Sequence, residues 1–260
     1  SHPQTKPLTW RVWVTYEALG LHPAYIEVSI PAGQPFVPGS TRVYAYTVTG
    51  STKHRGAMIN YADGSTPGLS VTEPLPGAAD QTLRVNFPDA LPGAPNSKYW
   101  VEFETSIADT FIEASYTNTA VHHNDYNPTI DLPATVSVRR GGELVSKSGI
   151  QGSDGYAWWT LEVNASQSTL DAGATIVDSL SLNQNYVPGS LSIVPASVDR
   201  NGRMTASGPP LTETTDYTVN VTETSSSKQV TIAFVNAIDQ AYIATFKCTI
   251  YAEEGGGNTQ

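Results

Sequence analysis

Histidine, aspartate and cysteine are among the residue types of this chain that could ligate a metal ion or act in nucleophilic catalysis, and the spacing of these three types favours neither role. His122 and His123 stand near Asp125, a composition that could ligate a metal ion. Adjacent residues of a strand point to opposite faces, so His122 and His123 could not both reach one metal ion. We therefore interpret this segment as a solvated linker between domains. Cys248 falls on the same strand face as Tyr242, which predicts a small buried side chain and not a reactive thiol. The five histidines and the serines show no triad spacing, and we expect no cofactor and no metal.

The composition is that of a β-rich, acidic chain. Its 260 residues include 18 Pro and only 14 Lys and Arg, and the formal net charge is −10. Phosphate binding needs clustered cations, so we expect no nucleic-acid partner. The single cysteine excludes an intrachain disulfide. No hydrophobic segment is long enough to span a membrane and no sorting signal is found, so we expect any anchor to lie outside this sequence.

Alternation of apolar and polar residues with a period of two predicts strands throughout. It is clearest in 10–14, 83–87 and 242–250, and clusters of Gly, Pro, Asn and Ser separate such segments. No convincing helical period is found. We predict an all-β chain of two tandem immunoglobulin-like β-sandwich domains, at residues 1–132 and 133–260.

An internal repeat supports this division. The matching blocks are, in order, 25–30 and 176–180, 37–40 and 187–190, 83–91 and 230–238, and 99–107 and 242–250. With a gap of one residue, the first block places Glu27 in register with Asp178. Each half then ends on an Asn-Thr pair, which begins at Asn118 in the first half and at Asn258 in the second. Four blocks in the same order indicate a duplication.

The second half resembles the collagen-binding-type domains of cell-wall-anchored adhesins of Gram-positive bacteria. The segments that carry the resemblance are Lys147, 159–164, 176–180, 186–191, 211–219 and 242–250. They cover nearly all of residues 135–260, and the first half follows more loosely through the repeat. The resemblance implies a monomeric extracellular module that is not an enzyme. It also implies a host extracellular-matrix protein or another surface ligand as partner.

Many domains of that family form a spontaneous isopeptide bond, in which a lysine amine displaces the amide nitrogen of an asparagine beside a buried acid. Carried over by position, the resemblance assigns Lys147 as the nucleophile, Asp178 as the assisting acid and Asn258 as the acceptor. A solvated lysine is protonated and cannot attack, whereas burial in an apolar core favours the neutral amine. Fixed contact supplies the high effective molarity of an intramolecular reaction. The reaction occurs once per molecule and is not enzymatic turnover.

In the first domain the repeat places Glu27 as the acid and Asn118 as the acceptor. The lysine is open. Lys6 lies four residues before Trp10, whereas Lys147 lies twelve residues before its matching tryptophan. Either Lys6 serves from a shortened lead-in, or the reactive lysine lies upstream of this sequence, or the domain has no bond.

The resemblance favours an extracellular, cell-wall-anchored adhesin that attaches cells to host matrix or another surface. The alternative is a set of stalk or pilin-type domains without ligand binding of their own. A carbohydrate-active enzyme would need a carboxylate pair in a cleft, and no feature of the sequence singles one out. Trp158 and Trp159 are adjacent, so one of the two rings should face outward from a regular strand.

Overall fold

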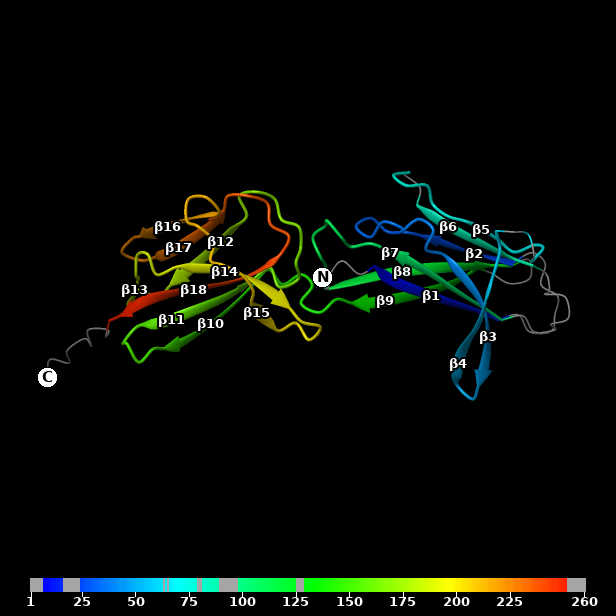
Figure 1. Ribbon diagram of the computed structural model, residues 1–260, viewed down its shortest axis with the longest axis horizontal. Helices are drawn as coiled ribbons and strands as arrows, with labels where there is room; N and C mark the ends of the chain where they lie inside the picture. The colour runs from blue at the N-terminus through cyan, green and yellow to red at the C-terminus, as the bar shows by residue number, and fades with distance from the viewer. Residues whose placement is uncertain are drawn as a thin grey trace. The chain divides into compact units, whose positions relative to one another are not determined.

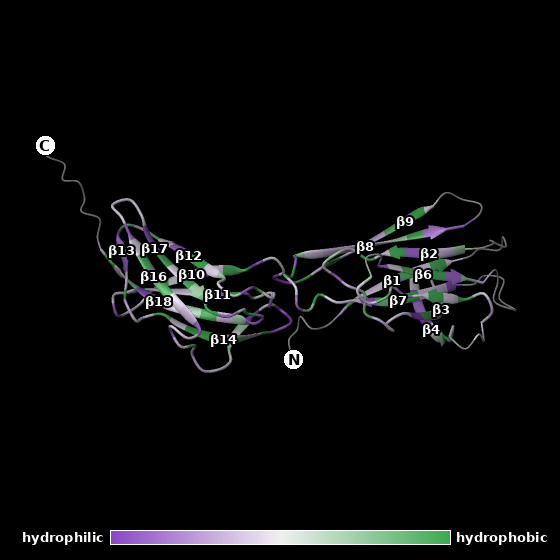
Figure 2. Cartoon of the chain, turned by 90° about the horizontal axis from the view of Figure 1, so that it is seen from above, coloured by the Kyte–Doolittle hydropathy of each residue, from purple (hydrophilic) through white to green (hydrophobic). Residues whose placement is uncertain are grey.

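The computed structural model describes residues 7–15, 24–62, 64, 66–78, 81–88, 98–124 and 129–251. These ranges form eighteen β-strands and no helix, which confirms the prediction of an all-β chain (Figure 1). Since no helix occurs in the described ranges, none of sufficient length and apolarity to cross a membrane is found there. Along the strands, apolar and polar residues alternate (Figure 2), because successive side chains of a strand point to opposite faces.

The chain divides into two compact units. The first, called here the N-terminal unit, contains Thr5–Ala108 and Ser115–Ser137. Its strands are β1 (Leu8–Thr15), β2 (Ala24–Ser29), β3 (Arg42–Thr49), β4 (Thr52–Ile59), β5 (Ser70–Thr72), β6 (Thr82–Phe87), β7 (Lys98–Thr105), β8 (Ser115–His123) and β9 (Ile130–Ser137). They form two antiparallel sheets, a four-stranded sheet in the order β1-β7-β3-β4 and a five-stranded sheet in the order β5-β6-β2-β8-β9.

The C-terminal unit contains Asp109–Ala114 and the chain from Val138 onward. Its strands are β10 (Val145–Gln151), β11 (Ala157–Val163), β12 (Thr175–Leu180), β13 (Gln184–Tyr186), β14 (Ser192–Val198), β15 (Met204–Ala206), β16 (Tyr217–Glu223), β17 (Lys228–Phe234) and β18 (Ala241–Ile250). One sheet has the order β10-β11-β18-β14-β15, with β13 also pairing β18, and the other has the order β12-β17-β16.

The division between the units differs from the predicted boundary at residue 132. β9 pairs with β8 along its whole length, from Ser115 opposite Ser137 to His122 opposite Ile130. A strand that exchanges ladder hydrogen bonds with a sheet belongs to the unit of that sheet. The first unit therefore extends to Ser137.

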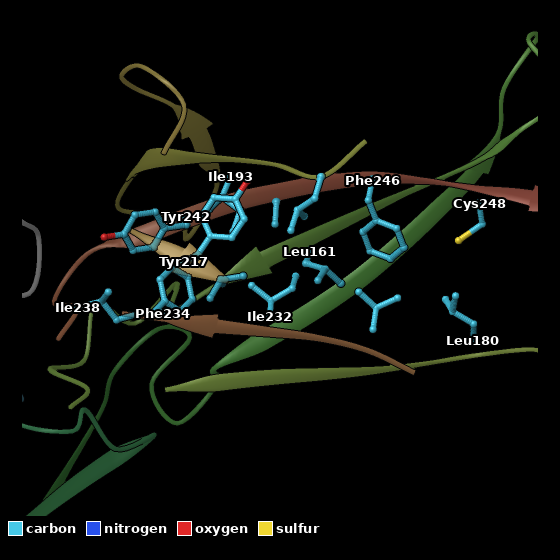
Figure 3. Close-up of a cluster of buried hydrophobic side chains, with 14 of the residues drawn as sticks. Leu161, Leu180, Ile193, Tyr217, Ile232, Phe234, Ile238, Tyr242, Phe246 and Cys248 are labelled. Atoms are coloured by element: carbon cyan, nitrogen blue, oxygen red, sulfur yellow. The ribbon is translucent and has the colours of Figure 1, made fainter. Parts of the chain in front are cut away.

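The core of the C-terminal unit lies between its two sheets. Leu161 and Phe246 point inward from one sheet, and Ile232 and Phe234 meet them from the other (Figure 3). Cys248 is fully buried in the same cluster, which confirms the predicted apolar role of this residue. Two sheets packed over a shared apolar core are the β-sandwich that the sequence predicts.

The repeat in the sequence is also a repeat in the structure. Residues 83–87 and the matching 230–234 lie in β6 and β17, and residues 99–105 and the matching 242–248 lie in β7 and β18. The turns at 37–40 and 187–190 make the same contact. Ser40 Oγ accepts a hydrogen bond from the Glu104 backbone at 3.0 Å, and Ser190 Oγ accepts one from the Lys247 backbone at 3.1 Å. The glycine in each turn has a positive φ, 72° and 74°, a conformation that glycine adopts without strain.

Candidate functional site

Lys147 reaches into the C-terminal unit from an edge strand. On β10 it lies directly opposite the buried Leu161 of β11, so its side chain is on the inner face of that sheet. Its Nζ lies 4.0 Å from the centroid of the Trp159 ring. Trp159 is held in turn by a hydrogen bond of 3.0 Å from its Nε1 to Gln184 Oε1. The aromatic face and the neighbouring strand therefore direct the lysine amine into the sandwich.

Asp178 meets this amine from the other sheet. It lies on β12 with its side chain on the core face, and 8% of the residue is exposed. Lys147 Nζ donates to Asp178 Oδ1 at 2.6 Å and to Oδ2 at 2.8 Å, and 28% of the lysine side chain is exposed. The structure thus brings together the predicted nucleophile and the predicted acid.

The surroundings of the pair are apolar. Asp178 lies opposite the fully buried Val230 of β17, and Leu180 follows it on the same face of β12. Burial, with a further contribution from the negative charge of Asp178, raises the pKa of the Cys248 thiol to about 11. The thiol therefore stays protonated at neutral pH and does not compete with Lys147 as a nucleophile. Asn258 lies outside the described residues.

In the N-terminal unit the structure does not bring Glu27 and Asn118 together. Glu27 lies on the outer face of β2, where its carboxylate contacts Arg84 at 3.2 Å and His123 at 3.4 Å. Asn118 is buried on the core face of β8. Lys6, the remaining candidate in this unit, lies outside the described residues.

Strand register explains why Glu27 faces outward. Val28 lies opposite Leu83 of β6, just as Asp178 lies opposite Val230 of β17, and Leu83 and Val230 are the matching residues of the repeat. The residue at the position of Asp178 is therefore Val28, which is fully buried. An offset of one residue moves a side chain to the other face of a sheet. The apolar alternation of β2 is the sequence signal that would have revealed the offset.

The buried amide of Asn118 has an unusual environment. No hydrogen-bond partner of its Nδ2 is found among the described residues. It lines a cavity of about 20 Å³ together with Trp10, Phe103, Leu132 and Ala134. A cavity of this size can hold one water molecule, which would satisfy the amide.

The two histidines of the His122-His123-Asp125 segment have contacts of other kinds. His123 stacks on Tyr25 with ring centroids 4.4 Å apart, and it contacts Glu27. Burial lowers the pKa of His122, and the neighbouring His123 lowers it further. Asp125 lies outside the described residues. Within the described part of the chain, no three His, Cys, Asp or Glu side chains are grouped to hold a metal ion.

The two adjacent tryptophans of β11 face opposite ways, as predicted. Trp159 packs against the core, whereas Trp158 lies on the outer face of the sheet. There Lys247 Nζ lies 4.2 Å from the centroid of the Trp158 ring, and Trp158 Nε1 donates to Asp154 Oδ1 at 3.2 Å. Sequence reasoning did not identify Trp159 and Gln184 as the residues that position Lys147. Their contact joins strands 25 residues apart, and no motif marks it.

A family model described as "Collagen binding domain" matches residues 2–129 and 142–256, once over each repeat. Similar solved structures include the collagen-binding domain from a Staphylococcus aureus adhesin, at 16% identity over 50% of this chain and 88% of that chain, with a TM-score of 0.35. The collagen binding domain of the Erysipelothrix rhusiopathiae surface protein RspB is 10% identical over 96% of this chain and 77% of that chain, with a TM-score of 0.31. The RrgB pilus backbone of Streptococcus pneumoniae is 10% identical over 98% of this chain and 46% of that chain, with a TM-score of 0.35. No curated protein matches the chain.

Proposed function

Because this chain belongs to the collagen binding domain family, we propose that it is the ligand-binding region of a bacterial surface adhesin, stabilised by an intramolecular Lys-Asn isopeptide bond. The observation that carries the proposal is the contact between Lys147 and the buried Asp178 inside a sandwich that the family model matches. The adhesin acts outside the cell, anchored to the wall of a Gram-positive bacterium, and its partner is an extracellular-matrix protein such as collagen.

The bond forms in the C-terminal unit without any added reagent. Asp178 accepts a proton from the Lys147 amine along the hydrogen bond between them. The neutral Nζ then attacks the side-chain carbonyl carbon of Asn258, and the carboxylic acid polarises the carbonyl oxygen by hydrogen bonding. The Nζ–Cγ bond forms, Nζ gives up one proton, the Cγ–Nδ2 bond breaks, and the leaving NH2 group takes up one proton, relayed by Asp178, and departs as ammonia.

The other repeat supports the assignment of Asn258 as acceptor. In the N-terminal unit β2 pairs with β6 on one edge and with β8 on the other, and Val28 lies opposite Ala120 of β8. Asn118 is two residues from Ala120, so it lies on the same face and diagonal to Val28. Within the described ranges β12 pairs only with β17. The edge of β12 that faces away from β17 matches the edge of β2 that pairs with β8, so the repeat favours Asn258, the match of Asn118, as the acceptor.

The N-terminal unit contains no bond in this proposal. Val28 stands where a bond-forming domain needs its acid, and Glu27 is engaged with Arg84 on the outer face. Among the described residues of this unit the buried acid is Glu102, on the outer face, so no described acid on the core side can accept the lysine proton or polarise the Asn118 amide. Of the three alternatives for this unit, the register supports the absence of a bond.

Mass spectrometry of the intact protein tests the cross-link. The measured mass should be lower than the calculated mass by one ammonia, and a proteolytic digest should contain a branched peptide that joins Lys147 to Asn258. Lys147→Ala should restore the full mass of its sequence. An unmodified parent mass would exclude the bond, and a loss of two ammonia molecules would show that the N-terminal unit also reacts.

Ligand binding is tested separately, with type I collagen immobilised on a sensor surface. An adhesin region should bind the triple-helical form, whereas heat-denatured collagen serves as the control for binding to unfolded chains. Retention of the cross-link together with an absence of binding to collagen and other matrix proteins would favour the alternative, a stalk or pilin-type segment.

A further inference from the structure

The outer face of the sheet β1-β7-β3-β4 gathers aromatic and cationic side chains. On β1 and β7 the residues Trp10, Val12, Tyr99 and Val101 point into the core, so their neighbours in sequence point outward. β3 and β4 extend this face as a hairpin that projects from the rest of the unit (Figure 1). We call it the aromatic-cationic face, and its residues are Arg11, Trp13, Tyr44, Lys53, Arg55, Trp100 and Glu102.

A single carboxylate organises the centre of this face. Glu102 is 9% exposed, and its Oε1 accepts hydrogen bonds from Arg11 Nε at 2.9 Å and from Trp100 Nε1 at 3.1 Å. Its Oε2 accepts one from Arg55 Nη1 at 3.1 Å. The two arginines and the tryptophan are thereby held in fixed positions before any ligand arrives. Each guanidinium uses one nitrogen for Glu102, which leaves further N–H groups directed elsewhere.

Each ring on the face carries a cation. Arg11 lies over Trp100 at 5.7 Å from the ring centroid, and Lys53 lies over Trp13 at 5.0 Å. Trp13 and Trp100 contact each other edge to face, with centroids 5.4 Å apart. Arg55 lies over the ring of Tyr44 at 4.7 Å, one strand further on. Aromatic surface and positive charge therefore alternate across neighbouring strands.

The face is exposed and its charge is opposite to that of the chain. Trp13 is 41% exposed, and about half of each of the Arg11 and Arg55 side chains is exposed. By strand alternation Arg42, Lys98 and Glu104 also lie on this side. Five of the chain's 14 Lys and Arg thus stand on one sheet face against two carboxylates, although the whole chain carries a net charge of −10.

We propose that the aromatic-cationic face binds an acidic polysaccharide, a glycan whose sugar rings carry carboxylate or sulfate groups. The apolar faces of sugar rings stack on tryptophan and tyrosine, while the anionic groups pair with guanidinium and ammonium groups between the rings. Fixed arginines lose little conformational entropy on binding, which favours a ligand with repeated charges. This ligand class goes beyond the proposed function, and binding at this face does not depend on the isopeptide bond.

Calorimetric titration with a heparin oligosaccharide tests the proposal. The wild-type protein should bind the oligosaccharide, and the affinity should fall as sodium chloride is raised from about 50 to about 300 mM, because salt screens exposed charges. Trp13→Ala removes one stacking ring, and Lys53→Glu replaces one cation by an anion, so each should weaken binding at least about ten-fold. Inorganic sulfate lacks sugar rings and neutral dextran lacks charge. Each should therefore bind at least about a hundred-fold more weakly than heparin, which corresponds to the loss of two stacked or paired groups at about ten-fold each.

The C-terminal unit provides matched controls. Lys247 lies over Trp158 at 4.2 Å on the outer face of a sheet, so this pair repeats the same local chemistry without Glu102 and its arginines. Trp158→Ala and Lys247→Glu should leave heparin binding unchanged. The proposal is overturned if heparin does not bind, if dextran binds equally well, or if the control variants weaken binding as much as Trp13→Ala and Lys53→Glu do. It is also overturned if those two variants abolish binding to collagen but not to heparin, since the face would then serve a protein ligand.

Discussion

Replacement of Lys147 by methionine is the sharpest test of the site between the two sheets. Methionine keeps an unbranched side chain of similar length, so packing on Trp159 is largely retained. The change removes the amine and hence the isopeptide bond, and it also removes the nitrogen atom that lies 2.6 Å from Asp178 Oδ1. The variant should fold into the same sandwich with a much lower free energy of unfolding.

Two contributions set the size of the loss. A bond from Lys147 to Asn258 closes a loop of about 110 residues. In the chain-entropy model a cross-link over about 100 residues contributes about 4.7 kcal/mol. The variant also leaves the buried Asp178, which is 8% exposed, without the hydrogen-bonding nitrogen of residue 147, and a buried polar group left unsatisfied costs about 1 to 3 kcal/mol. The lower part of that range applies, because 28% of the Lys147 side chain is exposed. A loss of at least about 5 kcal/mol, or about 20 °C in Tm at roughly 4 °C per kcal/mol, is expected.

Differential scanning calorimetry measures the loss of stability in Lys147→Met, and intact-mass measurement shows whether the isopeptide bond is absent. Lys247→Met is the matched control. Lys247 also pairs with an aspartate, Asp154 at 3.2 Å, and 30% of its side chain is exposed, but it lies on the outer face. The control should lose no more than about 1 kcal/mol and should keep the ammonia deficit of the parent. If Lys147→Met and Lys247→Met lose equal, small amounts of stability and neither changes the ammonia deficit, the reasoning is refuted.

Three further predictions concern single residues. Burial raises the pKa of the Cys248 thiol from 9.0 to about 11, so between these pH values the thiol ionises in the unfolded state but not in the folded state. The free energy of unfolding should therefore be highest below pH 9 and should fall by up to about 2.7 kcal/mol as the pH rises to 11. Urea titrations should show this fall in the wild type and a smaller one in Cys248→Ala; identical pH profiles would contradict it. Asn164→Ala removes a buried side chain that donates to the carbonyls of Ser168 at 2.8 Å and Gln240 at 3.1 Å, and chemical denaturation should show a loss of about 3 kcal/mol. Val28→Asp places an unpaired carboxylate at a fully buried position, so it should lower the free energy of unfolding by about 3 to 5 kcal/mol at pH 7. Denaturation at a pH low enough to protonate the carboxylate should show a smaller loss, whereas a loss that does not depend on pH would argue against burial of this position.

Much of the fold could be predicted from local patterns. Period-two alternation reports which residues face a core, so strands such as 242–250 were identifiable without tertiary information. The two turns at 37–40 and 187–190 recur with the same local hydrogen bond, from Ser40 N to Val37 O at 3.2 Å and from Ser190 N to Val187 O at 3.1 Å, because Pro-Gly-Ser favours a tight turn on its own. The pairing of Lys147 with Asp178 was also predicted, although from family resemblance and not from spacing alone.

Register and cross-strand contacts were decided only by the tertiary structure. Glu27 and Val28 are neighbours in sequence, and which of them faces the core depends on hydrogen bonding to β6, a strand more than fifty residues away. The organisation of Glu102 with Arg11 and Arg55 joins three strands separated by 47 to 91 residues. The amino-acid sequence determines which side chains can form an ion pair or a stacked pair, because those properties belong to each residue. Which of them meet depends on how the strands align, and a shift of one residue exchanges the buried and exposed faces of a whole strand.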